Sequence, residues 1–132
     1  MQPTLYLVNH IVTNNFNDPD ILQKFNRLWQ ESSHLFAGGN AVYGVYHNYR
    51  SDYKGDYTCS TATETVQEKA DVLTPPETDY RIFPCTRETV PQTWQQIWQL
   101  EENGGLSRAY QADYEKYCAD GSVEIHIGLK AQ

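Results

Sequence analysis

The sequence predicts an α+β fold in which two halves of β-α-β-β type share one antiparallel sheet, with the helices packed on one side. One observation is that β-branched or aromatic runs alternate with segments of helical periodicity. Another is that strands and helices follow a similar order before and after the loop at 69–78. The chain has 132 residues, which fits a single domain over 1–132 with pseudo-symmetric halves near 1–73 and 79–132.

The first half opens with an apolar, β-branched strand at 4–12. Asp18 or Asp20 can cap the helix that follows. That helix, at 21–36, is the clearest element of the chain because its apolar residues recur every three or four positions. Its apolar face consists of Ile21, Phe25, Leu28, Trp29, Leu35 and Phe36. The Ala-Gly-Gly-Asn sequence at 37–40 ends it.

Two strands at 42–49 and 56–66, joined by a turn at 51–55, are expected to form a hairpin. In the first of them Gly44 and Tyr46 share a face. Because glycine has no side chain, another group is expected to lie close to the backbone at Gly44.

The second half is expected to begin with a strand at 79–85, followed by a helix that Pro91 opens and the sequence at 103–105 ends. Ser107 is expected to cap a second, short helix. Tyr110, Tyr114, Tyr117 and Cys118 would share one side of this short helix. The closing strand, at 123–129, alternates apolar residues with Glu124, His126 and Gly128.

Charge and cysteine content limit the classes of partner. Ten Lys and Arg stand against seventeen Asp and Glu, which gives a net charge of −7, so the surface would repel nucleic acid and attract cations. Cys59, Cys85 and Cys118 are widely spaced and form no CxxC pair, which is typical of free thiols in a reducing compartment. With no signal peptide and no apolar run of about 18 residues, a cytoplasmic protein without membrane contact is expected.

The strongest candidate for a binding residue is Glu115, which lies between Tyr114 and Tyr117. A carboxylate held among aromatic rings would be costly to bury unless it met a cation or gained a raised pKa. Such a group would suit an aromatic cation, which needs flat π faces and a negative charge. The alternative is a solvated helix acid paired with Lys116 or Arg108.

Further candidates have equally plain alternatives. Trp94 and Trp98 lie four residues apart on one helix face, where tryptophan is more often a core residue than a ligand contact, although both hold if the helix roofs a cleft. Tyr46 is similar. Glu124 and His126 line the polar face of the last strand, which is either an ordinary solvated face or the floor of a cleft.

No motif indicates a metal, a nucleotide cofactor or a catalytic nucleophile. The four histidines show neither HxH nor HxxxH spacing, and the chain contains no GxSxG, GxGxxG or Walker sequence. We therefore expect no cofactor and no enzymatic activity.

The order of several motifs resembles the gyrase-inhibitor-like, or AraC-type effector-binding, domain family. The motifs are VYGVYHNY, GDYT, DYRIFPC, TWQQIW, DYEKY and VEIHIGL, and they cover essentially the whole chain. The resemblance implies two β-α-β-β repeats with a ligand cleft between them. It also implies that Glu115 is the central acid of an aromatic cage and that Trp94 opens the cleft helix. Glu124 and His126 would match acidic and aromatic positions of the closing strand.

Because no helix-turn-helix precedes the first strand, the chain is most similar to stand-alone members, some of which are integron cassette proteins that bind cationic drugs. The expected function is binding of amphipathic, aromatic cations. A separate transcription regulator is left open as a partner. The expected ligand contacts are Glu115, Trp94, Trp98, Tyr46, Tyr114, Tyr117, Glu124 and His126. Two alternatives stay open: hydrolysis of a reactive metabolite in the same cleft, and inhibition of a partner protein. An exposed edge strand also leaves a homodimer open.

Overall fold

The computed structural model describes residues 2–130 and contains one seven-stranded antiparallel sheet with the strand order β4-β1-β3-β2-β6-β7-β5. The strands are β1 (Leu5–Thr13), β2 (Val42–His47), β3 (Tyr57–Thr63), β4 (Asp71–Leu73), β5 (Tyr80–Thr86), β6 (Ala112–Tyr117) and β7 (Ser122–Gly128). The helices are α1 (Ile21–Glu31) and α2 (Val90–Glu102), with short 3₁₀ helices at Ser33–Gly38 and Arg87–Thr89. The predicted α+β class is confirmed.

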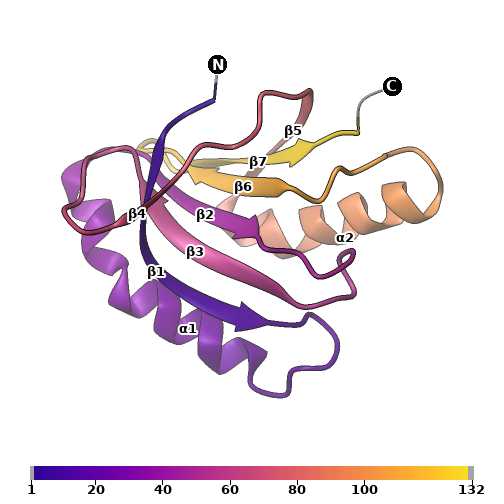
Figure 1. Ribbon diagram of the computed structural model, residues 1–132, viewed down its shortest axis with the longest axis horizontal. Helices are drawn as coiled ribbons and strands as arrows, with labels where there is room; N and C mark the ends of the chain where they lie inside the picture. Colours follow the sequence, from indigo (N-terminus) through magenta and orange to yellow (C-terminus); the bar gives the residue numbers. More distant parts are fainter. Residues whose placement is uncertain (1, 131–132) are drawn as a thin grey trace.

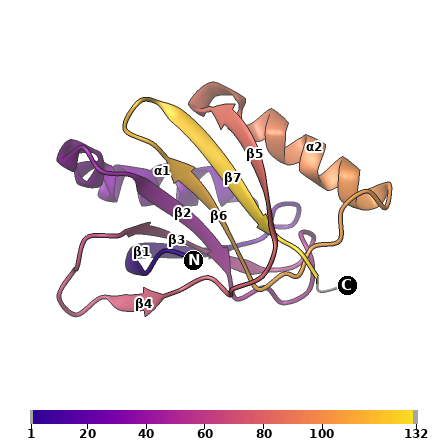
Figure 2. The same cartoon turned by 90° about the horizontal axis from the view of Figure 1, so that it is seen from above.

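Strands and helices follow the same order twice along the chain. β1, α1, β2 and β3 are matched by β5, α2, β6 and β7, and the strands lie in the orders β1-β3-β2 and β5-β7-β6. β2 and β6 pair with each other and join the two sets into one sheet. Both helices lie on the same side of that sheet (Figures 1 and 2). The division into pseudo-symmetric halves near 1–73 and 79–132 stays a prediction.

The prediction of a short helix after Ser107 is wrong. Residues 112–117 form the strand β6, between β2 and β7. The helical spacing of the tyrosines suggested a helix, but tyrosine also favours strands. Here the backbone of residues 112–117 pairs with β2 and β7. In a strand, alternate residues point to opposite faces. Tyr114 and Glu115 therefore lie on opposite faces of the sheet.

Two other boundaries differ from the expectation. The helix predicted over 21–36 ends at Glu31 and continues as the 3₁₀ helix Ser33–Gly38. At the break, the buried Ser32 hydroxyl lies 2.7 Å from Thr61 Oγ1 and 3.2 Å from Asn9 Nδ2, and these contacts tie it to the sheet. The predicted loop at 69–78 contains the three-residue strand β4, which pairs with β1.

The two faces of the sheet have separate apolar clusters. The helix face, on which Gly44, Tyr46 and Glu115 lie, carries one cluster beneath α1, around Leu28, and a second beneath α2, around Ile97. The opposite face carries a cluster of Leu5, Tyr43, Val45, Ala62 and Tyr114.

No helix within residues 2–130 is long and apolar enough to cross a membrane.

Removal of the side chain that holds α2 on the sheet should destabilise the fold. Ile97 is fully buried and packs in one cluster with Ile125 and Ile127 of β7. We expect Ile97→Ala to lower the free energy of unfolding by about 2–5 kcal/mol in urea titrations, because it leaves a cavity. Val66→Ala is the control, since Val66 is 70% exposed and should change stability by less than about 0.5 kcal/mol. Equal effects of the two variants would contradict this account of α2.

Candidate functional site

A cavity of about 410 Å³ lies on the helix face, with α1 and α2 as its walls and β2, β3 and β6 as its floor. This volume is within the range of small-molecule sites. The lining is mainly aromatic, with one carboxylate among the rings. It includes Phe25, Trp29, Tyr46, Trp94, Glu115 and Tyr117.

Glu115 is the centre of a hydrogen-bonded aromatic cage. Its carboxylate accepts hydrogen bonds from the Tyr46 hydroxyl at 2.7 Å and the Trp94 indole N–H at 2.6 Å, both to Oε2. The Tyr117 hydroxyl donates to Oε1 at 2.6 Å. Glu115 is only 2% exposed. The alternative of a solvated acid is therefore wrong, and neither Lys116 nor Arg108 forms a salt bridge with Glu115 within the described chain.

Strand register explains how these groups meet. Glu115 of β6 pairs with Gly44 of β2, and Tyr46 lies two residues along β2 on the same face. A Cβ at Gly44 would lie 3.2 Å from Trp29 Cζ2 and 3.3 Å from Glu115 Oε1, closer than ordinary contact. The missing side chain at Gly44 therefore lets α1 approach the sheet directly beside the carboxylate, as the sequence predicted for this glycine.

Burial raises the pKa of Glu115 above its ordinary value, while the hydrogen bonds from Tyr117, Trp94 and Tyr46 act in the opposite direction. Burial and the nearby Glu115 charge raise the pKa values of the Tyr46 and Tyr117 phenols, so both remain hydrogen-bond donors. The carboxylate is thus surrounded by neutral donors that satisfy its oxygens without neutralising its charge.

A second carboxylate of β6 has a different environment. Asp113 is fully buried and points to the same face as Glu115, since the two are two residues apart in the strand. Its Oδ2 accepts hydrogen bonds from the Arg108 guanidinium at 2.7 Å and the Tyr49 hydroxyl at 2.6 Å. Its Oδ1 accepts from the backbone N–H of Gly128 at 2.8 Å. Asp113 is therefore neutralised by a guanidinium, whereas Glu115 is not.

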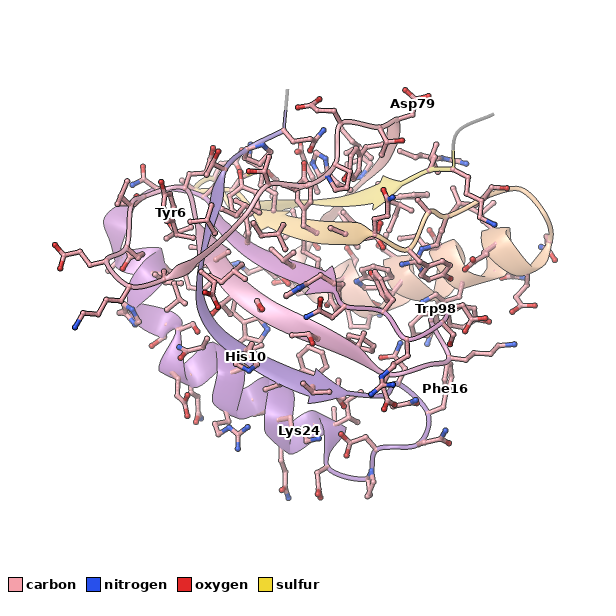
Figure 3. All side chains as sticks on the ribbon, in the orientation of Figure 1. Tyr6, His10, Phe16, Lys24, Asp79 and Trp98 are labelled. Carbon is pink, nitrogen blue, oxygen red and sulfur yellow. The ribbon has the colours of Figure 1, made fainter. Side chains whose placement is uncertain are left out.

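Aromatic rings also line the cavity where the turn between β2 and β3 meets α2. Tyr53 stacks on Trp98 with centroids 5.4 Å apart and planes at 12°, and both line the cavity. Phe16, from the loop between β1 and α1, lies 5.9 Å from each of these rings and is 58% exposed. Figure 3 shows Phe16 beside Trp98 at this end of the molecule.

The structure brings five of the eight predicted ligand contacts together at this cavity. They are Glu115, Trp94, Trp98, Tyr46 and Tyr117.

The other three lie on the opposite face of the sheet. Tyr114 stacks on His126 with centroids 4.5 Å apart, and His126 Nε2 lies 3.0 Å from Glu124 Oε1. Burial lowers the pKa of His126, although Glu124 opposes this effect. Tyr114, Glu124 and His126 therefore do not lie in the cavity between α1 and α2, as was expected. In β7, Ile125 and Ile127 point to the helix face beneath α2, so the residues that alternate with them point to the other face.

Several lining residues were missing from the sequence-based set. Trp29 and Phe25 belong to the predicted apolar face of α1, which we interpreted only as a core face. Tyr57 starts β3, and its position on the cavity floor depends on strand register. Arg108 lies between α2 and β6, where no sequence pattern indicates a buried position.

A second cavity, of about 670 Å³, lies on the other side of the sheet beside β1, β3 and the segment 67–71. Its lining is mostly polar and includes His47, whose Nε2 lies 2.8 Å from Ser60 Oγ. It has no Phe, Tyr or Trp in its lining. Within residues 2–130, no group of three or more His, Cys, Asp or Glu side chains is arranged to hold a metal.

Comparison with protein families identifies the chain through residues 6–129, which match the Cass2 model of integron-associated effector binding proteins. The chain belongs to this family. It is thus an effector-binding module, and the resemblance noted from its motifs is confirmed. A search of curated protein sequences finds no significant match.

Two solved structures share the fold of this Cass2 member. One is an integron cassette protein from the mobile metagenome of Vibrio cholerae, with a TM-score of 0.77 and 21% identity over 97% of this chain and 90% of the other. The other is SAV2435 bound to tetraphenylphosphonium, with a TM-score of 0.70 and 16% identity over 98% of this chain and 90% of the other. At these identities the similarity concerns the fold alone.

A methyl group at Gly44 should disturb the cage. We expect Gly44→Ala to lower the free energy of unfolding by about 1–3 kcal/mol, because Trp29 and Glu115 must both move away from the new Cβ. Urea unfolding measures the loss, and near-UV circular dichroism reports the changed tryptophan environment. Gly38→Ala is the matched control, since its Cβ would meet only Asn40 Nδ2, at 4.0 Å. A neutral Gly44→Ala variant would show that the space beside Gly44 is not needed.

Proposed function

We propose that this Cass2 protein binds amphipathic, aromatic cations in the cavity between α1 and α2, with Glu115 as the negative contact. The observation that carries the proposal is the burial of Glu115 among neutral donors on the floor of an aromatic cavity. A buried carboxylate without a positive partner is costly, and a bound cation would remove that cost.

The aromatic lining of the cavity suits an apolar, aromatic cation rather than a small hydrated ion. Tyr46 and Trp94 meet edge to face with centroids 5.1 Å apart, and Trp29 and Tyr117 do so at 5.2 Å. A cation over an aromatic face gains about 0.5–2 kcal/mol per contact. Several such contacts and one desolvated carboxylate are enough for micromolar affinity, which corresponds to about −8 kcal/mol. The relative SAV2435, which was solved with tetraphenylphosphonium, makes this compound a natural probe.

Loss of the Glu115 charge should weaken binding. We expect Glu115→Gln to bind tetraphenylphosphonium and rhodamine 6G at least about 5-fold more weakly than the wild type, since the amide keeps the shape but not the charge. Isothermal titration calorimetry and dye fluorescence polarisation measure the two affinities.

Two variants make this test specific. Glu31→Gln removes an equal charge from the exposed end of α1 and should leave both affinities within about 2-fold. Glu124→Gln probes the opposite face of the sheet, where the sequence suggested an additional contact. Equal affinities for the wild type and Glu115→Gln would contradict the proposed role of Glu115, and selective weakening by Glu124→Gln would transfer the site to the other face.

Affinity for a permanent cation should rise with pH. Because burial raises the pKa of Glu115 in the empty protein, part of the population holds a proton there just above the ordinary glutamate value of 4.5. The cation favours the ionised form, so binding must displace that proton. Tetraphenylphosphonium does not titrate, and its affinity should therefore increase from pH 4.5 through the raised pKa and then become constant.

Calorimetry in buffers of different ionisation enthalpy measures the released proton directly. Glu115→Gln should lose both the proton release and the part of the pH dependence that Glu115 causes. A pH profile that is the same in both proteins would show that another group titrates.

We further propose that the protein binds its ligand without converting it, and that it acts as a cytoplasmic sensor or sequestering module. Recovery of intact rhodamine 6G after prolonged incubation supports binding alone, whereas appearance of a hydrolysed product would support the hydrolase alternative. We also keep two proposals about partners: a separate transcription regulator and a second copy of this chain in a homodimer.

A further inference from the structure

The oxygen atoms of Glu115 have little capacity left for hydrogen bonds from a ligand. A carboxylate has about four lone-pair sites on its two oxygens. Oε2 accepts hydrogen bonds from Tyr46 at 2.7 Å and from Trp94 at 2.6 Å, and Oε1 accepts one from Tyr117 at 2.6 Å. Donors of the protein therefore occupy all but about one of these sites.

The site that is left, on Oε1, lies in a closely packed corner. The position that a Cβ at Gly44 would take is 3.3 Å from Oε1 and 3.2 Å from Trp29 Cζ2, so the Gly44 backbone and the Trp29 ring bound the space beside this oxygen. Glu115 is only 2% exposed. Its charge still attracts a cation, because a Coulomb interaction needs no direct contact, but an N–H group of a ligand has little access to its oxygens.

The rest of the described lining offers few acceptors to a buried N–H group. The hydroxyl groups of the other lining tyrosines donate to the protein, and their acceptors are Asn15 Oδ1 for Tyr57, Asp113 Oδ2 for Tyr49 and Glu102 Oε1 for Tyr53. Arg108 contributes donors alone. The Gln95 amide is exposed on α2. The remaining acceptors are phenol oxygens, which are weaker acceptors than a carboxylate.

Two kinds of cation differ in what they require from such a cavity. A primary ammonium is strongly hydrated and has three N–H donors, and burial of a donor without an acceptor is costly. A quaternary ammonium or phosphonium ion has no such donor, and aromatic cages bind ions of this type through their ring faces. A cavity with a negative charge, many rings and few acceptors matches the second kind.

We infer that the positive centre of the ligand is a quaternary ammonium, phosphonium or similar onium group, and that the protein discriminates against protonated amines. This inference rests on the proposed function and specifies the chemical class of its cation. Tyr46, Trp94 and Tyr117 have two roles in this account. They stabilise the buried carboxylate, and they determine specificity because they keep ligand donors away from its oxygens.

Two fluorescent ligands test this inference on the wild-type protein. 1-Pyrenemethylammonium and its N,N,N-trimethyl derivative have the same ring system and one positive charge at pH 7.5, but only the first has N–H donors. We expect the trimethyl compound to bind about 10-fold more tightly, because the unpaired donors of the primary ammonium oppose its burial. Fluorescence titration gives both dissociation constants.

The Tyr117→Phe variant separates hydrogen bonding from the larger apolar area of the methyl groups. It removes the donor to Glu115 Oε1 and leaves an acceptor for the primary ammonium, while the methyl groups keep their contribution. The ratio of the two affinities should therefore fall to about 3 or below. Both ligands carry the same charge, so a change in the ionisation of Glu115 cancels in this ratio.

Tyr114→Phe is the matched control. Tyr114 belongs to the same strand, but its hydroxyl donates to Gln2 on the opposite face of the sheet, so this variant should leave the ratio unchanged. Tyr46→Phe frees a site on Oε2 instead and should lower the ratio as Tyr117→Phe does. It replaces Tyr117→Phe in the test if circular dichroism shows that Tyr117→Phe does not fold.

The outcomes separate this inference from the proposed function. Equal or tighter binding of the primary ammonium by the wild type, with both ligands weakened by Glu115→Gln, would overturn the inference and leave the cation site intact. A ratio that keeps its wild-type value in the folded phenylalanine variants at 46 and 117 would overturn it too. Failure of both pyrene ligands and of tetraphenylphosphonium to bind would contradict the cation site and this inference together.

Discussion

The burial of a single carboxylate constrains the rest of this molecule. Glu115 is buried and has no basic partner among residues 2–130, and an isolated charge in such a place is tolerated only if its oxygens are well satisfied. Three neutral donors from β2, α2 and β6 satisfy them. This arrangement depends on the position of β6 beside β2 in the interior of the sheet, on the absence of a side chain at Gly44 and on the approach of α2.

The neighbouring Asp113, on the same strand, is a buried acid with an ordinary ion-pair partner. There the charge is cancelled by Arg108, and a backbone N–H takes the remaining oxygen. The contrast between the two acids supports different roles for them. Asp113 stabilises the fold through its ion pair with Arg108, whereas Glu115 lines the cavity without a basic partner among the described residues. Because they are two residues apart, both face the cavity side, yet only Glu115 retains an uncompensated charge.

Sequence reasoning predicted the fold class and most strands, because alternation and helical periodicity are local signals. The placement of Trp94 with Glu115 came from the family resemblance. It failed for β6, whose tyrosines fit both a helix and a strand, and pairing with distant strands decided between the two. That error also placed the side chains of Tyr114 and Glu115 in one site, although they point to opposite faces of β6. The closing strand was predicted correctly, but its faces were assigned without knowledge of where α2 packs, so Glu124 and His126 were expected on the cavity side. Trp29 and Arg108 become visible as wall residues only in three dimensions.

Selection of charge and selection of shape rest on different parts of this protein. The acid and its donors belong largely to the sheet, whereas much of the opposing wall consists of outward positions on helices, such as Leu22, which is 76% exposed. Substitution at such positions has little effect on folding. Under the proposed function, the shape of the accepted ligand can therefore change through these helix positions while the preference for a positive centre, which rests on Glu115, is kept. Such a change would be seen as variable residues on α1 and α2 and constant residues on β2, β3 and β6.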